Sequence, residues 1–385
     1  MEQVLTSNGS HEVRQLGVET ARSRLLKVVG AYVAVRVGLL VLDLIAAHRS
    51  FNGNLDGPME AWDSWHYIHI AQHGYPTLAP MIAGQLTFSD GAFGPVYPAL
   101  IAVLSFPLRS TVLAALAVSI IGGLVSTICV WRIAAHVKTE KVALRSALMF
   151  MLLPGMAIVW GTLYSECVGV AFASLSLLLM IEKKWLAAGI AGALAALASP
   201  IAIVLVAAPV ARSFANFRRR KEVLPPWIAA VTIPIGLLSF IAWLAHRYRD
   251  PLFWWHLQRQ GWGTQVDYGR SLLKLLPHWS RIGGQGPAWV QWIGIALVVA
   301  GIAAMILARL PLELNMYTIC VFVVLFSTSN LGFKPRLLVW AFPAVIAMAS
   351  SYPRWARRTT LAVFAALLPI FFVLYTTMGN SIAQP

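Results

Sequence analysis

The sequence predicts an all-α polytopic membrane protein with about 10–12 transmembrane or re-entrant helices. Of its 385 residues, 58% are hydrophobic and 12% are charged, whereas a soluble domain carries about 25% charged residues. Mean hydropathy is +0.71. Several apolar stretches reach the roughly 20 residues that a helix needs to cross a bilayer. A soluble core could not bury this much apolar surface, so we expect lipid to cover much of it.

The charged residues predict the partners and the compartment. The net charge of +15 fits the excess of Lys and Arg on the cytoplasmic side of membrane proteins. These cations are dispersed among hydrophobic segments, so they argue against nucleic acid and are compatible with anionic membrane lipids. Cys129, Cys167 and Cys320 lie in apolar segments without ligand-like spacing. They are interpreted as small core residues and not as disulfides or metal ligands. No cofactor is indicated with certainty, and a divalent cation stays open without support from the sequence.

The chain divides into a tail and one membrane domain. Residues 1–26 are polar and mixed in charge, which predicts a cytoplasmic N-terminal tail, and residues 27–385 form a single transmembrane domain. The clear apolar segments are roughly 28–47, 111–131, 145–163, 165–181, 226–245, 288–308, 313–330, 337–350 and 359–377.

Two further apolar stretches do not fit a simple span. Residues 97–108 would give only about 18 Å of helix, which is too short to cross. Residues 185–211 are long enough, but Ser199-Pro200 lies in the middle. Basic clusters flank 185–211 on both sides, at 183–184 and at 212–221. If both clusters are cytoplasmic, this stretch enters and returns as two short segments broken near Pro200, and 97–108 is re-entrant or interfacial.

Irregular backbone at membrane depth needs protein or a water-filled cavity around it, so we expect a cavity near both breaks. The alternative for 185–211 is an ordinary proline kink in one long helix. With the N-terminus in the cytoplasm, the elements on the outside are loops 48–96 and 247–287, with three short turns at 164–166, 199–200 and 332–336.

The first outer loop carries the most unusual polar residues. Ala61–Gly74 holds an acid, three histidines and three large aromatics, a mixture typical of a helix in the membrane interface. Asp63 and His66 are three residues apart, so they would be neighbours on one helical face. The pair fits a general base, a metal pair or a structural hydrogen bond. A carboxylate beside Trp62 and Trp65 at a membrane surface suits a general base acting on a sugar hydroxyl.

The other outer elements add an acid and several cations. Glu166 follows Tyr164 at the edge of the bilayer, where an acid is either functional or solvated by the interface. Residues 250–263 form an amphipathic, aromatic segment that contains Arg259 and Trp262. Near the C-terminus, Lys334 and Arg336 would bind a phosphate or anchor the chain at the interface.

Five segments together resemble a known family. Trp62-Asp63-Ser64-Trp65-His66-Tyr67, followed by Ile70-Ala71 and Gly74-Tyr75, is similar to the first-loop signature of PIG-V-type mannosyltransferases, which are membrane glycosyltransferases of the GT-C class. The remaining segments follow in similar order and are Phe93-Gly94-Pro95-Val96-Tyr97-Pro98, Tyr164-Ser165-Glu166, Asp250–Phe253 with Gln260–Gly263, and Arg336 with Phe342-Pro343. They cover about residues 28–350, and the sequence looks most like actinobacterial members.

This resemblance implies transfer of a sugar, usually mannose, from a polyprenyl-phosphate-linked donor to a lipid or protein acceptor. The reaction would occur with inversion on the extracytoplasmic side of the plasma membrane. Asp63 would be the general base, with His66 beside it, and we expect one cavity to join Asp63 to Arg336. The residues expected to bind donor or acceptor are Trp62, Tyr67, Tyr97, Tyr164, Glu166, Arg259, Trp262, Lys334 and Arg336.

Two other functions stay open at this point. The family commonly has an arginine before its Trp-Asp pair and an Arg-Pro at the broken helix, whereas this chain has Ala61 and Ser199. An inactive relative that acts as an assembly subunit would explain both differences. A lipid or glycolipid transporter or flippase would need charged residues within its spans, and Arg36 and Asp43 are the main candidates. No Gly-x-x-x-x-Gly-Lys-Ser/Thr sequence is present to support ATP-driven transport.

Overall fold

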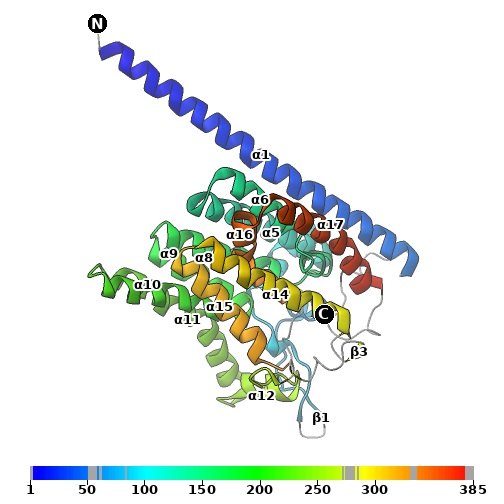
Figure 1. Cartoon of the computed structure of the whole chain (residues 1–385). Coiled ribbons are helices and arrows are strands. Elements are labelled where there is room, and N and C mark those ends of the chain that lie inside the picture. The colour runs from blue at the N-terminus through cyan, green and yellow to red at the C-terminus, as the bar shows by residue number, and fades with distance from the viewer. Residues whose placement is uncertain are drawn as a thin grey trace.

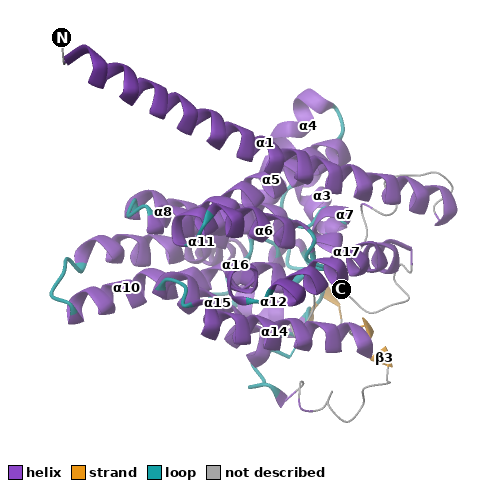
Figure 2. Cartoon of the chain, turned by 45° about the horizontal axis from the view of Figure 1, so that its top comes forward, coloured by secondary structure: helices purple, strands orange, loops and turns teal. Residues whose placement is uncertain are grey.

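Helices make up almost all of the described chain and pack side by side into a bundle (Figures 1 and 2). The structure, a computed structural model, describes residues 3–50, 63–82, 85–270, 286–329 and 336–377, together with 59, 273 and 282–283. The only strands among these residues are two short antiparallel pairs, β1 (Met81–Ile82) with β2 (Gln85–Leu86) and β3 (Ile282–Gly283) with β4 (Gly286–Pro287).

The helices follow the apolar pattern of the sequence. They are α1 (Gln3–Ser50), α3 (Ser64–His73), η1 (Asp90–Ala92), α4 (Val96–Leu108), α5 (Thr111–Val137), α6 (Glu140–Met151), α7 (Met156–Gly161), α8 (Glu166–Ile181), α9 (Trp185–Ala198), η2 (Pro200–Val206), α10 (Ala207–Arg218), α11 (Leu224–Tyr248), α12 (Phe253–Gln260), α14 (Ala288–Ala308), α15 (Leu312–Ser327), η4 (Leu337–Ala341), α16 (Phe342–Ser351) and α17 (Arg354–Thr377).

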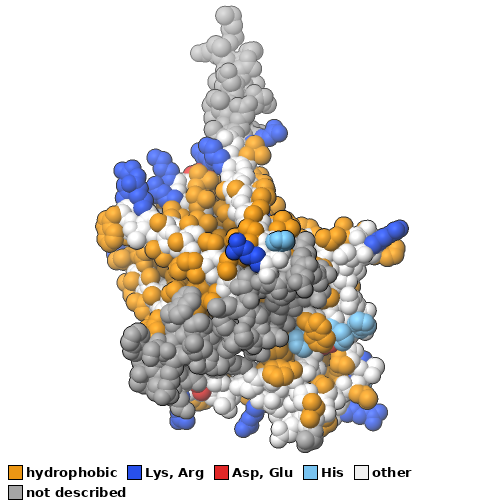
Figure 3. Space-filling view, turned by 90° about the vertical axis from the view of Figure 1, so that its right-hand side faces the viewer, with side chains coloured by type: hydrophobic (Ala, Val, Ile, Leu, Met, Phe, Trp, Pro, Cys, Tyr) orange, Lys and Arg blue, Asp and Glu red, His pale blue; other side chains and the backbone are white. Residues whose placement is uncertain are grey.

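The helices are long and apolar enough for a membrane protein. Five of them, within the described residues, could cross a bilayer by length and composition: Arg22–Arg49, Thr111–Val137, Pro200–Arg218, Leu224–Tyr248 and Arg354–Tyr375. Six shorter apolar helices accompany them. Hydrophobic side chains cover much of the flank in Figure 3, while Lys and Arg side chains lie mostly toward its upper and lower margins. The prediction of an all-α integral membrane protein is confirmed.

Small residues let the central helices approach closely. Helix α8 is buried along nearly its whole length and packs against α5 and α9, and α9 packs against α11. A Cβ atom added at Gly236 on α11 would lie 2.1 Å from the carbonyl oxygen of Ala193 on α9. Only a glycine permits this separation of the two backbones, an arrangement typical of helix pairs in membranes.

The stretch 185–211 is a hairpin and not one kinked helix. Helix α9 ends at Ala198, Ser199 is extended with a φ of −154°, and Pro200 begins η2. Trp185 at the start of α9 lines the same cavity as Arg212 near the end of α10. Both ends of the stretch therefore lie at one end of the bundle, as the basic clusters predicted.

The second irregular segment packs against this break. A Cβ atom added at Gly94 would lie 1.9 Å from the carbonyl oxygen of Leu197, so the backbone before α4 touches the last turn of α9. Phe93 and Ser199 line one cavity. The predicted cavity near both breaks is present at this contact.

Helix α1 crosses the predicted boundary between the tail (1–26) and the membrane domain (27–385). It runs unbroken from Gln3 to Ser50, and its N-terminal half projects away from the other helices (Figures 1 and 2). The sequence places the change from polar to apolar residues near 26, inside this helix. The cytoplasmic location of residues 1–26 stays a prediction.

Candidate active site

A cavity of about 310 Å³ lies at the end of the bundle where α9 breaks. Its wall comes from α3, α12, η2, the start of α8, the end of α15 and the start of η4. The lining combines polar with apolar side chains and includes Asp63, Tyr67, Phe93, Ser165, Glu166, Ser199, Pro200, Ile201, Ile203, Val204, Trp254, Trp255, Gln258, Thr264, Gln265, Val324, Thr328, Arg336 and Leu337.

Arg336 is the centre of the charged part of this cavity. Its Nη1 donates a hydrogen bond to Oδ2 of Asp63 at 2.9 Å, and its Nε lies 3.8 Å from Oε1 of Glu166. The guanidinium carbon lies 4.5 Å from the ring centroid of Tyr164. The three charged side chains are 13%, 15% and 6% exposed for Arg336, Asp63 and Glu166 respectively. One cation thus lies between two carboxylates and over an aromatic face.

These neighbours keep the guanidinium charged. Burial lowers the pKa of Arg336, but the nearby Tyr164, Glu166 and Asp63 raise it more, so the pKa lies above its usual range. Burial raises the pKa of Tyr164, and the negative charge of Asp63 adds to this effect. Tyr164 is therefore a neutral phenol beside a permanent cation.

Two contacts hold the start of α3 against the start of α8. Asp63 directly precedes α3, and its backbone N–H donates to the hydroxyl of Tyr164 at 3.2 Å. One turn further on, the hydroxyl of Tyr67 lies 2.7 Å from Oγ of Ser165. The segments Trp62–Tyr67 and Tyr164–Glu166, which the sequence singled out separately, therefore meet.

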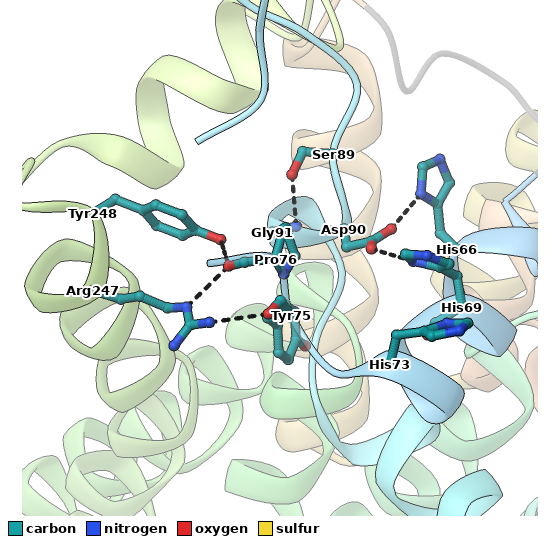
Figure 4. A network of polar contacts seen from close by, with 10 residues as sticks. All are labelled: His66, His69, His73, Tyr75, Pro76, Ser89, Asp90, Gly91, Arg247 and Tyr248. Carbon is teal, nitrogen blue, oxygen red and sulfur yellow. Dashed lines mark hydrogen bonds and ion pairs between the residues drawn. The ribbon is translucent and has the colours of Figure 1, made fainter. Parts of the chain in front are cut away.

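Asp90 fixes the opposite side of α3 (Figure 4). The Nδ1 atoms of His66 and His69 lie 2.8 Å and 2.7 Å from the two carboxylate oxygens of Asp90. The predicted pairing of His66 with Asp63 is wrong, because His66 binds Asp90 and Asp63 binds Arg336. Asp63 and His66 are one turn apart, but Asp63 lies just before the helix. Their partners, Arg336 for Asp63 and Asp90 for His66, approach from different sides.

The backbone just after α3 is tied to α11. The guanidinium of Arg247 donates to the carbonyl oxygens of Tyr75 and Pro76 at 3.0 and 3.1 Å. The hydroxyl of Tyr248 donates to the same oxygen of Pro76 at 2.7 Å (Figure 4). Together with Asp90, these bonds hold both ends of α3 in place and so position Asp63.

Two aromatic residues predicted to bind substrate support the wall instead. The fully buried ring of Tyr97 contacts the ring of Tyr67 edge-on, at 5.1 Å between centroids. The ring centroid of Trp262 lies 5.3 Å from that of Phe93 and 5.8 Å from that of His66. Neither Tyr97 nor Trp262 is among the residues that line the cavity, so the prediction of direct binding does not fit their positions.

The cations predicted to bind phosphate separate into different places. Arg336 lines the cavity, whereas Arg259 is exposed on α12 and does not line it. Trp62 and Lys334 lie outside the described residues. Arg36 and Asp43 are buried in α1 and do not line the cavity, and Nη1 of Arg36 donates to the carbonyl oxygen of Trp160 at 3.1 Å.

Helix α12 contributes residues that the sequence did not single out individually. Phe253 and Leu257 are the buried residues of this helix, and their neighbours Trp254 and Gln258 line the cavity. Residues four apart share a helical face, and this spacing was the available signal. The other residue missed was Asp90, whose two histidine partners precede it by 24 and 21 residues.

Comparison with known proteins shows that the chain resembles solved structures in its fold. No family model matches the sequence, and no curated protein sequence matches it. The structure is similar to ArnT from Cupriavidus metallidurans bound to undecaprenyl phosphate, with a TM-score of 0.54 and 14% identity over 91% of this chain and 76% of ArnT.

A second likeness is to the oligosaccharyltransferase AglB from Archaeoglobus fulgidus, in complex with an inhibitory peptide and a dolichol-phosphate. The TM-score is 0.51 and the identity 13%, over 92% of this chain and 56% of AglB. This chain thus spans a little over half the length of AglB and about three quarters of ArnT. Both are membrane glycosyltransferases, and the chain has the GT-C fold that they share.

Proposed function

We propose that the chain is an integral-membrane glycosyltransferase that moves mannose from a polyprenyl-phosphate donor to a lipid or protein acceptor, with inversion, outside the cytoplasm. The observation that carries the proposal is the meeting of Asp63, Glu166 and Arg336 at one cavity. These residues come from three separate segments of the chain. The lipid phosphates bound to ArnT and AglB support a donor of the same chemistry.

The two sides of the cavity suit the two parts of such a donor. Ile201, Val204, Val324 and Leu337 form an apolar surface, which fits the isoprene units next to the phosphate. Arg336 provides a guanidinium with the fork geometry that binds phosphate oxygens. The polar side chains of Gln258 and Thr264 line the cavity and would bind sugar hydroxyls.

In the proposed reaction, Asp63 accepts the proton of the acceptor hydroxyl. The acceptor oxygen then bonds to the anomeric carbon from the face opposite the phosphate, and the bond from that carbon to the phosphate oxygen breaks. The polyprenyl phosphate leaves with the bonding electrons, and Arg336 holds its charge. Inversion needs the base and the cation on opposite faces of the sugar, so the 2.9 Å contact between Asp63 and Arg336 has to open when the donor binds.

Mannose is proposed because the sequence motifs resemble those of mannosyltransferases. Ser199 is relevant to this choice because it is a departure from the motifs. Ser199 lines the cavity at the position where the family commonly has arginine. Serine in place of that arginine removes one cation from the wall but leaves Arg336 in place.

The proposal is tested by supplying the purified chain in proteoliposomes with radiolabelled polyprenyl-phosphate mannose. Extracted glycolipids and glycoproteins from cells lacking the gene serve as acceptors. We expect label to pass into one acceptor fraction, and no label to pass from GDP-mannose. If no label leaves the lipid donor, the assignment as a polyprenyl-phosphate mannosyltransferase is wrong.

The side of the membrane is tested by cysteine labelling from outside intact cells. Leu78 and Tyr268 are 80% and 85% exposed in the predicted outer loops, and Arg219 lies in the turn after α10. We expect a membrane-impermeant maleimide to label Leu78→Cys and Tyr268→Cys but not Arg219→Cys. Labelling of all three after permeabilisation is the control. External labelling of Arg219→Cys would reverse the proposed orientation.

A further inference from the structure

A second, larger cavity of about 970 Å³ lies at the other end of the same helices. Helix α8 begins at Glu166 in the first cavity and reaches the second cavity at Met180. Helix α9 runs the opposite way, from Trp185 in the second cavity to Ser199 in the first. The two cavities are therefore separated by the length of these helices, which is about 20 Å at 1.5 Å per residue.

The second cavity is strongly basic. Five Lys and Arg residues and one histidine line it, against two acids. One acid, Glu313, is buried and is held by both Nε and Nη2 of Arg212, so this pair contributes no net charge. The cations that remain are Lys183, Arg220, Lys221 and Arg309, with Glu222 as the remaining acid. Within the part of the chain that the structure describes, none of these four cations forms a salt bridge.

Three of these cations share an unusual backbone conformation just after the end of a helix. Lys183, Arg220 and Arg309 follow the ends of α8, α10 and α14 with φ values of 59°, 53° and 48°. Glycine or asparagine normally occupies this left-handed position after a helix. A cation there also interacts favourably with the dipole of its own helix. That interaction alone does not require the three helix ends to lie near one another. Here the three helix ends converge on one cavity.

The apolar part of the lining indicates what the cations bind. Val137, Ile181, Trp185 and Leu310 line the cavity beside the charges. Leu224, at the start of α11 next to the lining residue Pro225, is 75% exposed. A basic pocket between helix ends with an adjoining apolar surface matches the headgroup and first acyl carbons of an anionic phospholipid. A small soluble anion would leave the apolar surface unused.

We propose that this cavity is a binding site for a phosphate-bearing anion, and specifically for the headgroup of an anionic membrane phospholipid. The site is distinct from the proposed active site, because no residue lines both cavities. The proposal does not depend on sugar transfer. Free phosphate shares the headgroup chemistry and is distinguished by the experiment.

The experiment counts lipids retained by the purified, delipidated full chain in native mass spectrometry. The probes are phosphatidylglycerol, phosphatidylcholine and inorganic phosphate. We expect the wild type to retain phosphatidylglycerol in preference to phosphatidylcholine, and millimolar phosphate not to displace it. The triple variant Lys183→Gln/Arg220→Gln/Lys221→Gln should bind phosphatidylglycerol at least about tenfold more weakly, since each cation near a membrane surface contributes measurably to anionic lipid binding.

The control removes charge at the same predicted face but outside the cavity. Arg354 and Arg358 are exposed at the start of α17 and do not line it, so Arg354→Gln/Arg358→Gln should retain the lipid like the wild type. The single variant Lys221→Glu, at an exposed position, gives the same test if the triple variant fails to fold. Displacement by phosphate would support the anion site and overturn the lipid as its occupant. Equal retention of both lipids, or unchanged binding by the cavity variants, would overturn the site itself.

Discussion

Replacing Asp63 with asparagine is expected to lower sugar transfer by about 10²–10⁴-fold, the contribution of a positioned general base. Asparagine keeps the shape of the side chain and still offers an oxygen to Nη1 of Arg336, which donates at 2.9 Å in the wild type. Folding and membrane insertion should therefore be retained. The measurement is the initial rate of label transfer from polyprenyl-phosphate mannose at saturating donor.

Asp250→Asn is the matched control for this change. Asp250 lies in the other long outer loop, binds His256 at 2.7 Å and does not line the cavity. Its variant should keep the wild-type rate. Full activity of Asp63→Asn, with thermal stability unchanged, would remove Asp63 as the base and leave the fold assignment intact.

Replacing Arg336 with methionine is expected to affect both stability and activity. The change leaves Asp63 and Glu166 as neighbouring buried carboxylates without their cation. Breaking a buried ion pair in this way costs roughly 3–5 kcal/mol of folding free energy. Transfer should also be lost, because the leaving phosphate has no guanidinium to hold it. The free energy of unfolding in mixed micelles and the transfer rate measure the two effects.

A second substitution separates these effects. In Arg336→Met/Glu166→Gln one buried charge is removed, so stability should return in part while transfer stays absent. Arg259→Met makes the same chemical change at an exposed residue outside the cavity and should alter neither property. A double variant that regains transfer would show that Arg336 acts only through folding.

The sequence predicted much of the architecture because charge and hydropathy constrain membrane proteins strongly. The basic clusters on both sides of 185–211 predicted the hairpin at Pro200, and the structure brings Trp185 and Arg212 to one end. The charge argument also assigned Asp63, Glu166 and Arg336 to the same side. The structure places these three side chains in contact.

The detailed pairing in the site could not be predicted in the same way. Helical spacing suggested Asp63 with His66, but each of them binds a residue that is distant in the sequence. Asp90 carries no local signal, because it lies in a short 3-10 turn whose position depends on α3 and α12. Likewise, only the packing of Phe253 and Leu257 determines that Trp254 and Gln258 face the cavity.

The contact between Arg336 and Asp63 has a consequence for the order of substrate addition. On the proposed function, the carboxylate of Asp63 occupies on Arg336 a place that an oxygen of the donor phosphate would take. Base and leaving group therefore compete for one guanidinium. While the donor is absent, the base is engaged by its own protein; when the phosphate displaces it, the carboxylate becomes available to an incoming hydroxyl. Such a protein couples the reactivity of its base to the presence of the donor, so the donor would bind before the acceptor is activated.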